Sequence, residues 1–241
     1  MGCDEKSLYF IVMMQTDNKT VTGPPTQLKF IKYEMTSSCY AISWREDGNI
    51  LCCTYKDGIE VRSATDPDTE MRLIKRINIT GDVYTAYSVG DKLITKVSND
   101  DTVSTYIGSE STPQQTLLHQ YVGDSYSQLS VSDSIIADID SANKQLMIYT
   151  ITGDHQYDID ISEMSTPTGV HILSDGDGVL VSDSQSEGEV RKYELRAAQH
   201  HQPVWRCTGL TVPLGITSDQ SGLIYVTSAA ERKIYLISPL G

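Results

Sequence analysis

Short apolar segments alternate with polar turns along the whole chain, and this arrangement recurs about five times with a period of roughly 43 residues. Each copy begins with an apolar strand, passes through a tight polar turn, and returns along a second apolar strand. Glycine in such a turn supplies the positive φ angle that a two-residue hairpin requires. No segment shows the 3.6-residue apolar period of an amphipathic helix. The predicted glycine turns are Asp47-Gly48, Gly90-Asp91, Asp177-Gly178 and Ser221-Gly222.

A period of about 40 residues with about four short strands is typical of a β-propeller, whose sheets are arranged as blades around a ring. We name the strands of each copy A to D, from the centre of the ring outwards. The predicted strands are 40–44, 50–55, 59–63 and 72–79 in the first copy, 84–89, 92–97, 103–107 and 115–121 in the second, 126–131, 134–139, 145–151 and 156–161 in the third, 169–173, 179–182, 190–195 and 204–208 in the fourth, and 215–218, 223–228 and 233–237 in the fifth.

The number of blades depends on the N-terminal segment. Residues 8–15 and 27–34, with a weaker strand near 19–22, match strands B, C and D of one more blade, while the fifth copy lacks a D strand. An N-terminal strand that pairs with the last blade removes an exposed sheet edge. We therefore predict one all-β propeller domain over residues 1–241, with four-stranded blades, six blades favoured, and strands within 7–35 closing the ring. The alternative is five blades, with 27–34 as the missing D strand and 1–24 as an appendage.

The chain is strongly acidic, with 19 Lys and Arg residues against 32 Asp and Glu residues and a net charge of -13. A field of this sign repels phosphate backbones and anionic lipid, so nucleic-acid and membrane binding are disfavoured. The longest basic cluster is Arg72, Lys75 and Arg76.

Cysteine usage and the chain start indicate a cytoplasmic protein. The five cysteines are odd in number and irregular in spacing, which is typical of reduced intracellular proteins rather than of disulfide scaffolds. The N-terminus lacks the apolar core of a signal peptide, and the apolar segment 8–14 is too short to span a membrane. The triplets that begin at Asn18 and Asn78 match the glycosylation sequon and would instead indicate secretion.

The last copy resembles an NHL repeat, in which Pro-x-Gly and an apolar residue are followed by Asp-x-x-Gly-x-apolar-Tyr-Val. The fourth copy matches this pattern in part, and the other copies keep only the turn and the strands. The family's Asn-x-Arg after strand B is replaced here by Glu231-Arg-Lys233. The matching residues are Pro213, Gly215, Ile216, Asp219, Gly222, Ile224, Tyr225 and Val226 in the last copy, and Pro167, Gly169, Val170, Asp177, Gly178, Val181 and Asp183 in the fourth.

The chain is most similar to the C-terminal NHL-type propeller of tripartite-motif (TRIM) ubiquitin ligases. The resemblance implies a module that recognises a protein substrate or partner, and it does not imply catalysis. We expect no cofactor, and a closed ring with few open sheet edges predicts a monomer when the domain is isolated. The RING, B-box and coiled coil of that family have no counterpart in this sequence. Two alternatives are open: an RNA-binding NHL domain, because some relatives in the family read single-stranded RNA, and a metal-dependent propeller hydrolase or lyase. The five histidines occupy non-equivalent positions, which argues against a metal enzyme.

In propellers the D–A and B–C loops lie on one face, which is usually the ligand face. Here three successive copies place a tyrosine at the start of strand A, beside acidic loops that would suit a basic peptide. In the simpler interpretation the tyrosines pack between blades and the acids are solvated turns. The predicted partner-binding residues are Tyr40, Lys56, Asp57, Asp82, Tyr84, Asn99, Asp100, Asp101, Asp124, Tyr126, Asn143, Lys144, Glu231 and Arg232, with no catalytic and no metal-binding residue among them.

Overall fold

The computed structural model describes residues 7–13, 28–34, 39–45, 49–54, 58–63, 72–99, 101–110, 112–122, 127–185, 187–195, 202–219, 221–228, 230–231 and 233–238. All regular secondary structure in these ranges is β-strand. Every paired strand runs antiparallel to its neighbour. Nowhere in these ranges does a helix reach the length and hydropathy needed to cross a bilayer.

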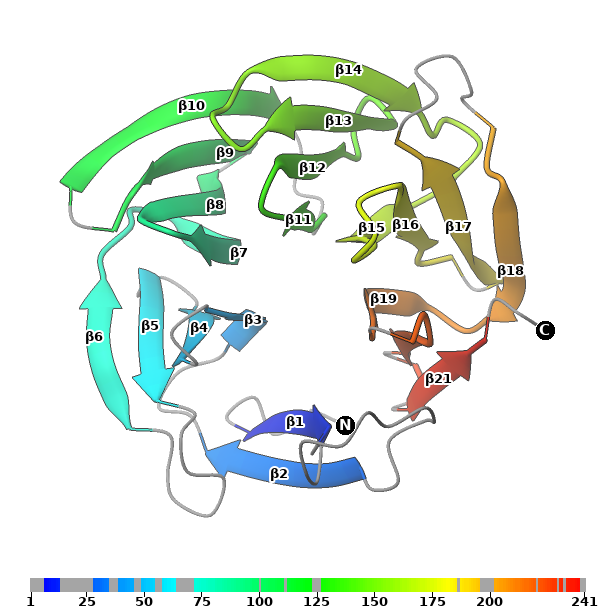
Figure 1. Ribbon diagram of the computed structural model, residues 1–241, viewed down its shortest axis with the longest axis horizontal. Coiled ribbons are helices and arrows are strands. Elements are labelled where there is room, and N and C mark those ends of the chain that lie inside the picture. The colour runs from blue at the N-terminus through cyan, green and yellow to red at the C-terminus, as the bar shows by residue number, and fades with distance from the viewer. Residues whose placement is uncertain are drawn as a thin grey trace.

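Five sheets are arranged around a ring as the blades of a propeller, with β3, β7, β11, β15 and β19 nearest the centre (Figure 1). Within each blade, consecutive strands along the chain are neighbours in the sheet. The blades are β3 (Cys39–Trp44), β4 (Asn49–Thr54), β5 (Gly58–Ser63) and β6 (Leu73–Ile77); β7 (Asp82–Val89), β8 (Lys92–Asn99), β9 (Thr102–Ser109) and β10 (Thr112–Val122); β11 (Leu129–Val131), β12 (Ile135–Asp140), β13 (Gln145–Thr150) and β14 (His155–Asp160); β15 (Pro167–Ile172), β16 (Gly178–Asp183), β17 (Gly188–Glu194) and β18 (Trp205–Leu210); and β19 (Pro213–Ser218), β20 (Ile224–Ser228) and β21 (Lys233–Ile237).

The propeller has five blades in its described part, which matches the five-blade alternative and not the favoured six. β1 (Ser7–Met13) and β2 (Leu28–Glu34) form a separate two-stranded sheet, paired from Ser7–Glu34 to Met13–Leu28. This sheet lies in the sector between the blade of β19 to β21 and the blade of β3 to β6 (Figure 1). β2 therefore pairs with β1 rather than completing the last blade. A role for these strands in closing the ring stays a prediction.

The apolar pattern of each strand follows its place in the blade. All six residues of β16 are buried, as expected for a strand covered on both faces by neighbouring sheets. In β6, by contrast, the first four of five residues are exposed, because this strand lies at the outer edge. Predicted strand bounds agree within a few residues. The largest differences are β11, which is confined to Leu129–Val131, and β10, which begins at Thr112.

Among the described residues, the core comprises four apolar clusters, each between two consecutive blades. Leu51 and Leu93 belong to the cluster between the first and second blades, and Ile94 and Ile136 to the next one. Leu93 and Ile94 are neighbours in β8, so their side chains point to opposite faces of the sheet and serve different clusters. The two remaining clusters join the third blade to the fourth and the fourth to the fifth. Successive blades are therefore joined by alternate residues of the B strands.

The A–B turns use glycine as predicted, with one correction. Gly90 and Gly222 have φ angles of 58° and 83°. In the fourth blade the positive φ, 69°, belongs to Gly176, whereas Gly178 is the first residue of β16. The predicted turn at Asp47-Gly48 lies outside the described residues.

Candidate functional site

The D–A and B–C loops emerge where the B strands end, and each B strand ends in a polar residue. At this position a side chain lies next to loop backbone, whose N–H and C=O groups need hydrogen-bond partners. Polar strand ends can satisfy these groups and fix the loops. The residues are Thr54, Asn99, Asp140, Asp183 and Ser228.

In the fourth and fifth blades these residues hold the preceding D–A loop. The Asp183 carboxylate accepts hydrogen bonds from the backbone N–H groups of Ser165, at 2.6 Å, and Thr166, at 2.7 Å. The Ser228 hydroxyl donates to the carbonyl of Thr211 at 2.6 Å. Hydrogen bonds to an ionised acceptor are the stronger kind, so Asp183 is an effective clamp.

Asp140 fixes a B–C loop and joins two blades. Its carboxylate accepts from the backbone N–H of Asn143 at 2.9 Å, from Nδ2 of Asn143 at 2.8 Å, and lies 2.9 Å from Nε2 of His119 on β10. Burial pushes the pKa of Asp140 upwards, but the hydrogen bonds from Asn143 and His119 outweigh burial and lower it. The carboxylate is thus kept charged while it is buried.

Three of the predicted partner-binding residues form contacts that hold the loops of this face. Asn143 supplies both hydrogen bonds to Asp140 just described. Lys144 adopts a φ angle of 56°, and its ammonium group donates to the carbonyl of Ser165 in the next D–A loop. Glu231 is exposed and accepts hydrogen bonds from Lys233, at 2.8 Å, and from the hydroxyl of Tyr235.

Four further predicted residues belong to the second blade. Asp82 and Tyr84 are half-buried at the start of β7, and Asn99 and Asp101 are exposed around the β8–β9 turn. The half-burial of Tyr84 is compatible both with packing between blades and with partner contact. Outside the described residues lie Lys56, Asp57, Asp100, Asp124, Tyr126 and Arg232, together with the side chain of Tyr40.

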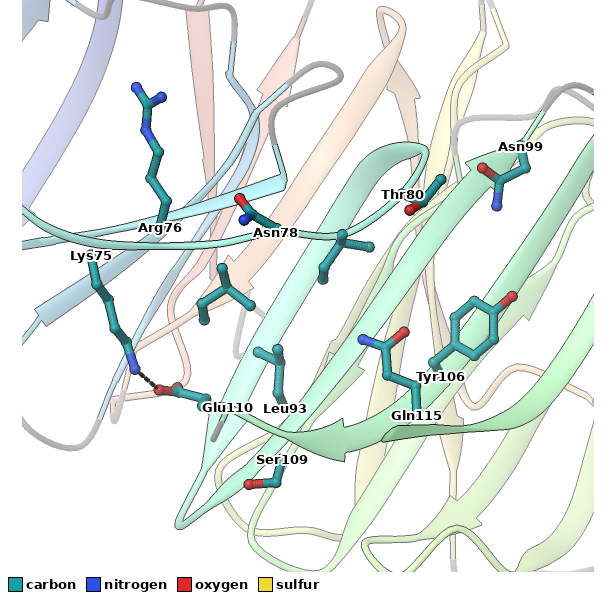
Figure 2. Close-up of a pocket in the computed structure, with 12 residues that line it drawn as sticks. Lys75, Arg76, Asn78, Thr80, Leu93, Asn99, Tyr106, Ser109, Glu110 and Gln115 are labelled. Atoms are coloured by element: carbon teal, nitrogen blue, oxygen red, sulfur yellow. Dashed lines mark hydrogen bonds and ion pairs between the residues drawn. The ribbon is translucent and has the colours of Figure 1, made fainter. Parts of the chain in front are cut away.

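A groove with a volume of about 570 Å³ separates the outer strand of the first blade from the second blade (Figure 2). One wall is the segment 75–80, which comprises the end of β6 and the start of the D–A loop. The opposite wall includes Leu93, Tyr106 and Gln115, and the groove runs from Glu110 in the β9–β10 turn to Asn99 at the end of β8. No pattern within one repeat predicts this groove, because its walls come from separate repeats.

Two carboxylates that pair with residues of the groove lining, Glu110 with Lys75 and Glu60 with Arg76, are each shared by two cations. Glu110 pairs with Arg45 and with Lys75, whose Nζ lies 2.6 Å from Oε2, and also accepts from Ser88 at 2.8 Å. Burial would raise the pKa of Glu110, but the hydrogen bonds from Lys75 and Ser88 and the charge of Arg45 lower it.

Glu60 in β5 has the same arrangement. Its side chain is fully buried, with Arg62 at 2.5 Å from one oxygen and Arg76 at 2.8 Å from the other.

Between the second and third blades lies a buried ion pair. Lys96 in β8 and Asp138 in β12 are both fully buried, and Nζ of Lys96 lies 2.6 Å from Oδ1 of Asp138. The ammonium also donates to the carbonyl of Ile139 at 2.6 Å and lies 5.3 Å from the ring centre of Tyr121. Oδ2 of Asp138 accepts from Thr105 at 2.6 Å. A lysine within the apolar strand 92–97 was the available sequence signal for this contact.

In the described ranges, no group of three or more His, Cys, Asp or Glu side chains is placed to hold a metal ion. His171 lies instead between the fourth and fifth blades, with Nε2 2.9 Å from Oγ of Ser218. Burial lowers its pKa to about 4, so it is neutral at physiological pH.

Comparison with known proteins leaves the family open. The sequence matches no protein-family model. No curated protein matches it at a significant level.

Proposed function

We propose that this chain is a non-enzymatic protein-interaction domain that binds a partner on the face formed by its D–A and B–C loops. One observation carries the proposal: the loops are fixed by hydrogen bonds from the ends of the B strands, as at Asp140 and Asp183. Loops fixed in this way lose little conformational entropy on binding, so more of the contact energy is available for affinity.

The exposed residues of this face favour a basic partner. Asn99 and Asp101 project around the β8–β9 turn of the second blade, and Glu231 belongs to the fifth. Acidic side chains at the rim of an interface steer an oppositely charged partner and suppress acidic competitors. By the sequence resemblance to NHL repeats, the partner would be the substrate of a TRIM-type ubiquitin ligase.

The experiment is a capture comparison with charge-reversal variants. The isolated chain, Asp101→Lys and Asp91→Lys are immobilised, exposed to cell lysate, and the retained proteins are identified by mass spectrometry. Asp91 is the matched control, because it is an exposed aspartate of the same blade in the A–B turn at the opposite end of the strands. Thermal melts first establish that both variants are folded.

We expect a protein retained by the wild type and by Asp91→Lys to be lost with Asp101→Lys. Identical retained sets for all three would contradict binding at this face. Salt-sensitive capture of a single-stranded RNA would favour the RNA-binding alternative, which the net charge of -13 disfavours.

A further inference from the structure

We propose that the groove between β6 and the second blade is a binding site for a neutral saccharide. The groove lies between two blades, whereas the protein partner proposed above binds on the face formed by the loops. The two sites also differ in the chemistry of their ligands, so either proposal can fail while the other stands.

A glycine in β9 hollows the second-blade wall of the groove. Gly108 pairs with Leu93 of β8 on one side and with Gln115 of β10 on the other, so the three positions form one row across the sheet. Cross-strand partners lie on the same face, and glycine places no side chain between its two neighbours. Tyr106 lies two residues before Gly108 and therefore on this same face. The groove volume of about 570 Å³ falls within the range of about 300 to 1,000 Å³ that is typical of small-molecule sites.

Three side-chain amides around this hollow are available to a ligand. Asn78 and Asn99 are exposed, Gln115 is half-buried, and all three line the groove. Among the residues that Figure 2 draws, the one marked interaction joins Lys75 to Glu110, and the amides have no partner in the lining. An amide carries both donors and an acceptor, so it can match a hydroxyl group, which also donates and accepts. Because the amides come from both walls, they can bind hydroxyl groups on opposite edges of one ligand.

The groove also offers apolar surface beside the amides. Tyr106 is half-buried and packs against the apolar cluster between the first and second blades, so its ring is held in place. Leu93 of the same cluster forms part of the lining. A sugar ring has hydroxyl groups around its edge and C–H groups on its faces. Amides around an aromatic ring and a leucine therefore match both kinds of surface.

The charged side chains of the lining favour a neutral ligand. Lys75 and Glu110 pair with each other at 2.6 Å, and Arg76 pairs with Glu60 at 2.8 Å. A charged ligand would have to compete with these ion pairs. An anionic one would in addition meet the field of a chain with a net charge of -13. A ligand that binds through hydroxyl groups leaves the pairs intact.

The test begins with the full chain, fluorescently labelled, on an array of neutral oligosaccharides built from common hexoses, pentoses and N-acetylhexosamines. A sugar that retains the protein is then titrated by isothermal titration calorimetry. We expect at least one sugar to bind, and its Kd to change less than about twofold between about 50 and 300 mM salt, because salt screens only charged ligands.

Three variants place the binding in the groove. Asn78→Ala and Gln115→Ala each remove one amide and should weaken binding about five- to tenfold. Gly108→Ala adds a methyl group to the hollow and should act in the same direction. Gln156→Ala is the matched control, because Gln156 is an exposed amide of β14, the outer strand of the third blade, and it should bind as the wild type does. Thermal melts first establish that each variant is folded.

Three outcomes would overturn the proposal: no sugar retains the protein, Asn78→Ala and Gln115→Ala bind as the wild type does, or Gln156→Ala weakens binding equally. If no sugar binds and the two groove variants instead lose a protein captured from lysate, the groove is a protein contact and not a saccharide site. Sugar binding that persists in Asp101→Lys, while that variant loses the captured protein, would support both the groove and the loop face.

Discussion

Replacing Lys96 with methionine is expected to destabilise the protein by about 3 to 4 kcal/mol at pH 7. Methionine is unbranched and of similar length, so the change removes the charge and leaves little cavity. The Asp138 carboxylate would then be fully buried without its ammonium partner, which lies at 2.6 Å in the wild type. Removing one member of a buried ion pair costs about 3 to 5 kcal/mol, because the remaining charge has lost its compensation.

Two features of the site place the penalty in the lower part of this range. Thr105 still donates to Oδ2 of Asp138 at 2.6 Å, so the carboxylate keeps one hydrogen bond. The penalty also has a ceiling, because the carboxylate can take up a proton on folding. Protonating an ordinary aspartate at pH 7 costs about 4 kcal/mol. If proton uptake sets the cost, the penalty should fall by about 1.4 kcal/mol for each unit of pH between 7 and 5.

The assay is urea unfolding of four proteins: wild type, Lys96→Met, Asp138→Asn and the double variant. In the double variant neither charge is buried, so its destabilisation should be at least about 3 kcal/mol smaller than the sum of the single effects. Lys92→Met is the control, because Lys92 lies on the same strand and donates to the carbonyl of Ile151, at 3.0 Å, rather than to a carboxylate among the described residues. It should cost about 1 kcal/mol.

If Lys96→Met costs less than about 1 kcal/mol, or if the double variant is destabilised by the sum of the two single effects, Lys96 does not compensate the charge of Asp138. A penalty that does not change between pH 7 and 5 would refute proton uptake by the orphaned carboxylate.

Three further predictions concern other buried groups. Because burial lowers the pKa of His171 from 6.5 to about 4, unfolding below pH 6.5 takes up a proton that the native state does not hold. Stability should therefore fall by about 2 kcal/mol as the pH drops to 5, and the fall should be smaller in His171→Gln when the two are compared by urea unfolding. Burial raises the pKa of the Cys53 thiol far above its ordinary value, so in the folded protein iodoacetamide should modify the half-buried Cys207 faster than the buried Cys53; equal rates for these two cysteines in peptide mass spectra would contradict this. Asp183→Ala leaves two loop N–H groups without their acceptor and should cost about 1 to 3 kcal/mol in urea, whereas the exposed Asp175→Ala should cost less than about 1.

The repeat and its strands could be predicted because they depend on local pattern. Apolar alternation and glycine turns are encoded within each copy, so most strand bounds agree within a few residues. β11 is shorter than predicted, because apolar character alone does not determine whether a residue is hydrogen-bonded in the sheet. The positive φ at Gly176 rather than at Gly178 is a difference of the same local kind.

Blade number could not be predicted, because it depends on which strands pair. The pattern of residues 28–34 is that of an ordinary strand and would fit either a sixth blade or the outer edge of the last one. The structure pairs β2 with β1 instead. Strand identity is a local property, whereas partner choice depends on the whole ring.

For the candidate sites, the position of the loop face could be predicted, but the contacts of individual residues could not. The loop face follows from strand order, and Asn99 and Asp101 are indeed exposed there. The clamping roles of Asn143 and Lys144 were missed, because their acceptors are identified only once the loops are placed. The groove was missed for a related reason: Lys75 and Glu110 belong to different copies of the repeat.

The contacts between blades differ in chemistry, and this bears on how repeated units find their correct neighbours. The second and third blades share the Lys96–Asp138 pair, and the fourth and fifth share His171 and Ser218. In repeat proteins, units of like shape are prone to misassembly and to exchange between molecules. A second or third blade in the wrong position would bury the charge of Lys96 or Asp138 without its counterpart, at a cost of several kcal/mol. At the junction of the fourth and fifth blades, a wrong neighbour would leave the neutral His171 ring without its hydrogen bond to Ser218. These contacts thus help each blade to select its correct neighbour. Variants that lack one of them should refold with more domain-swapped and aggregated species, even where the native state remains stable.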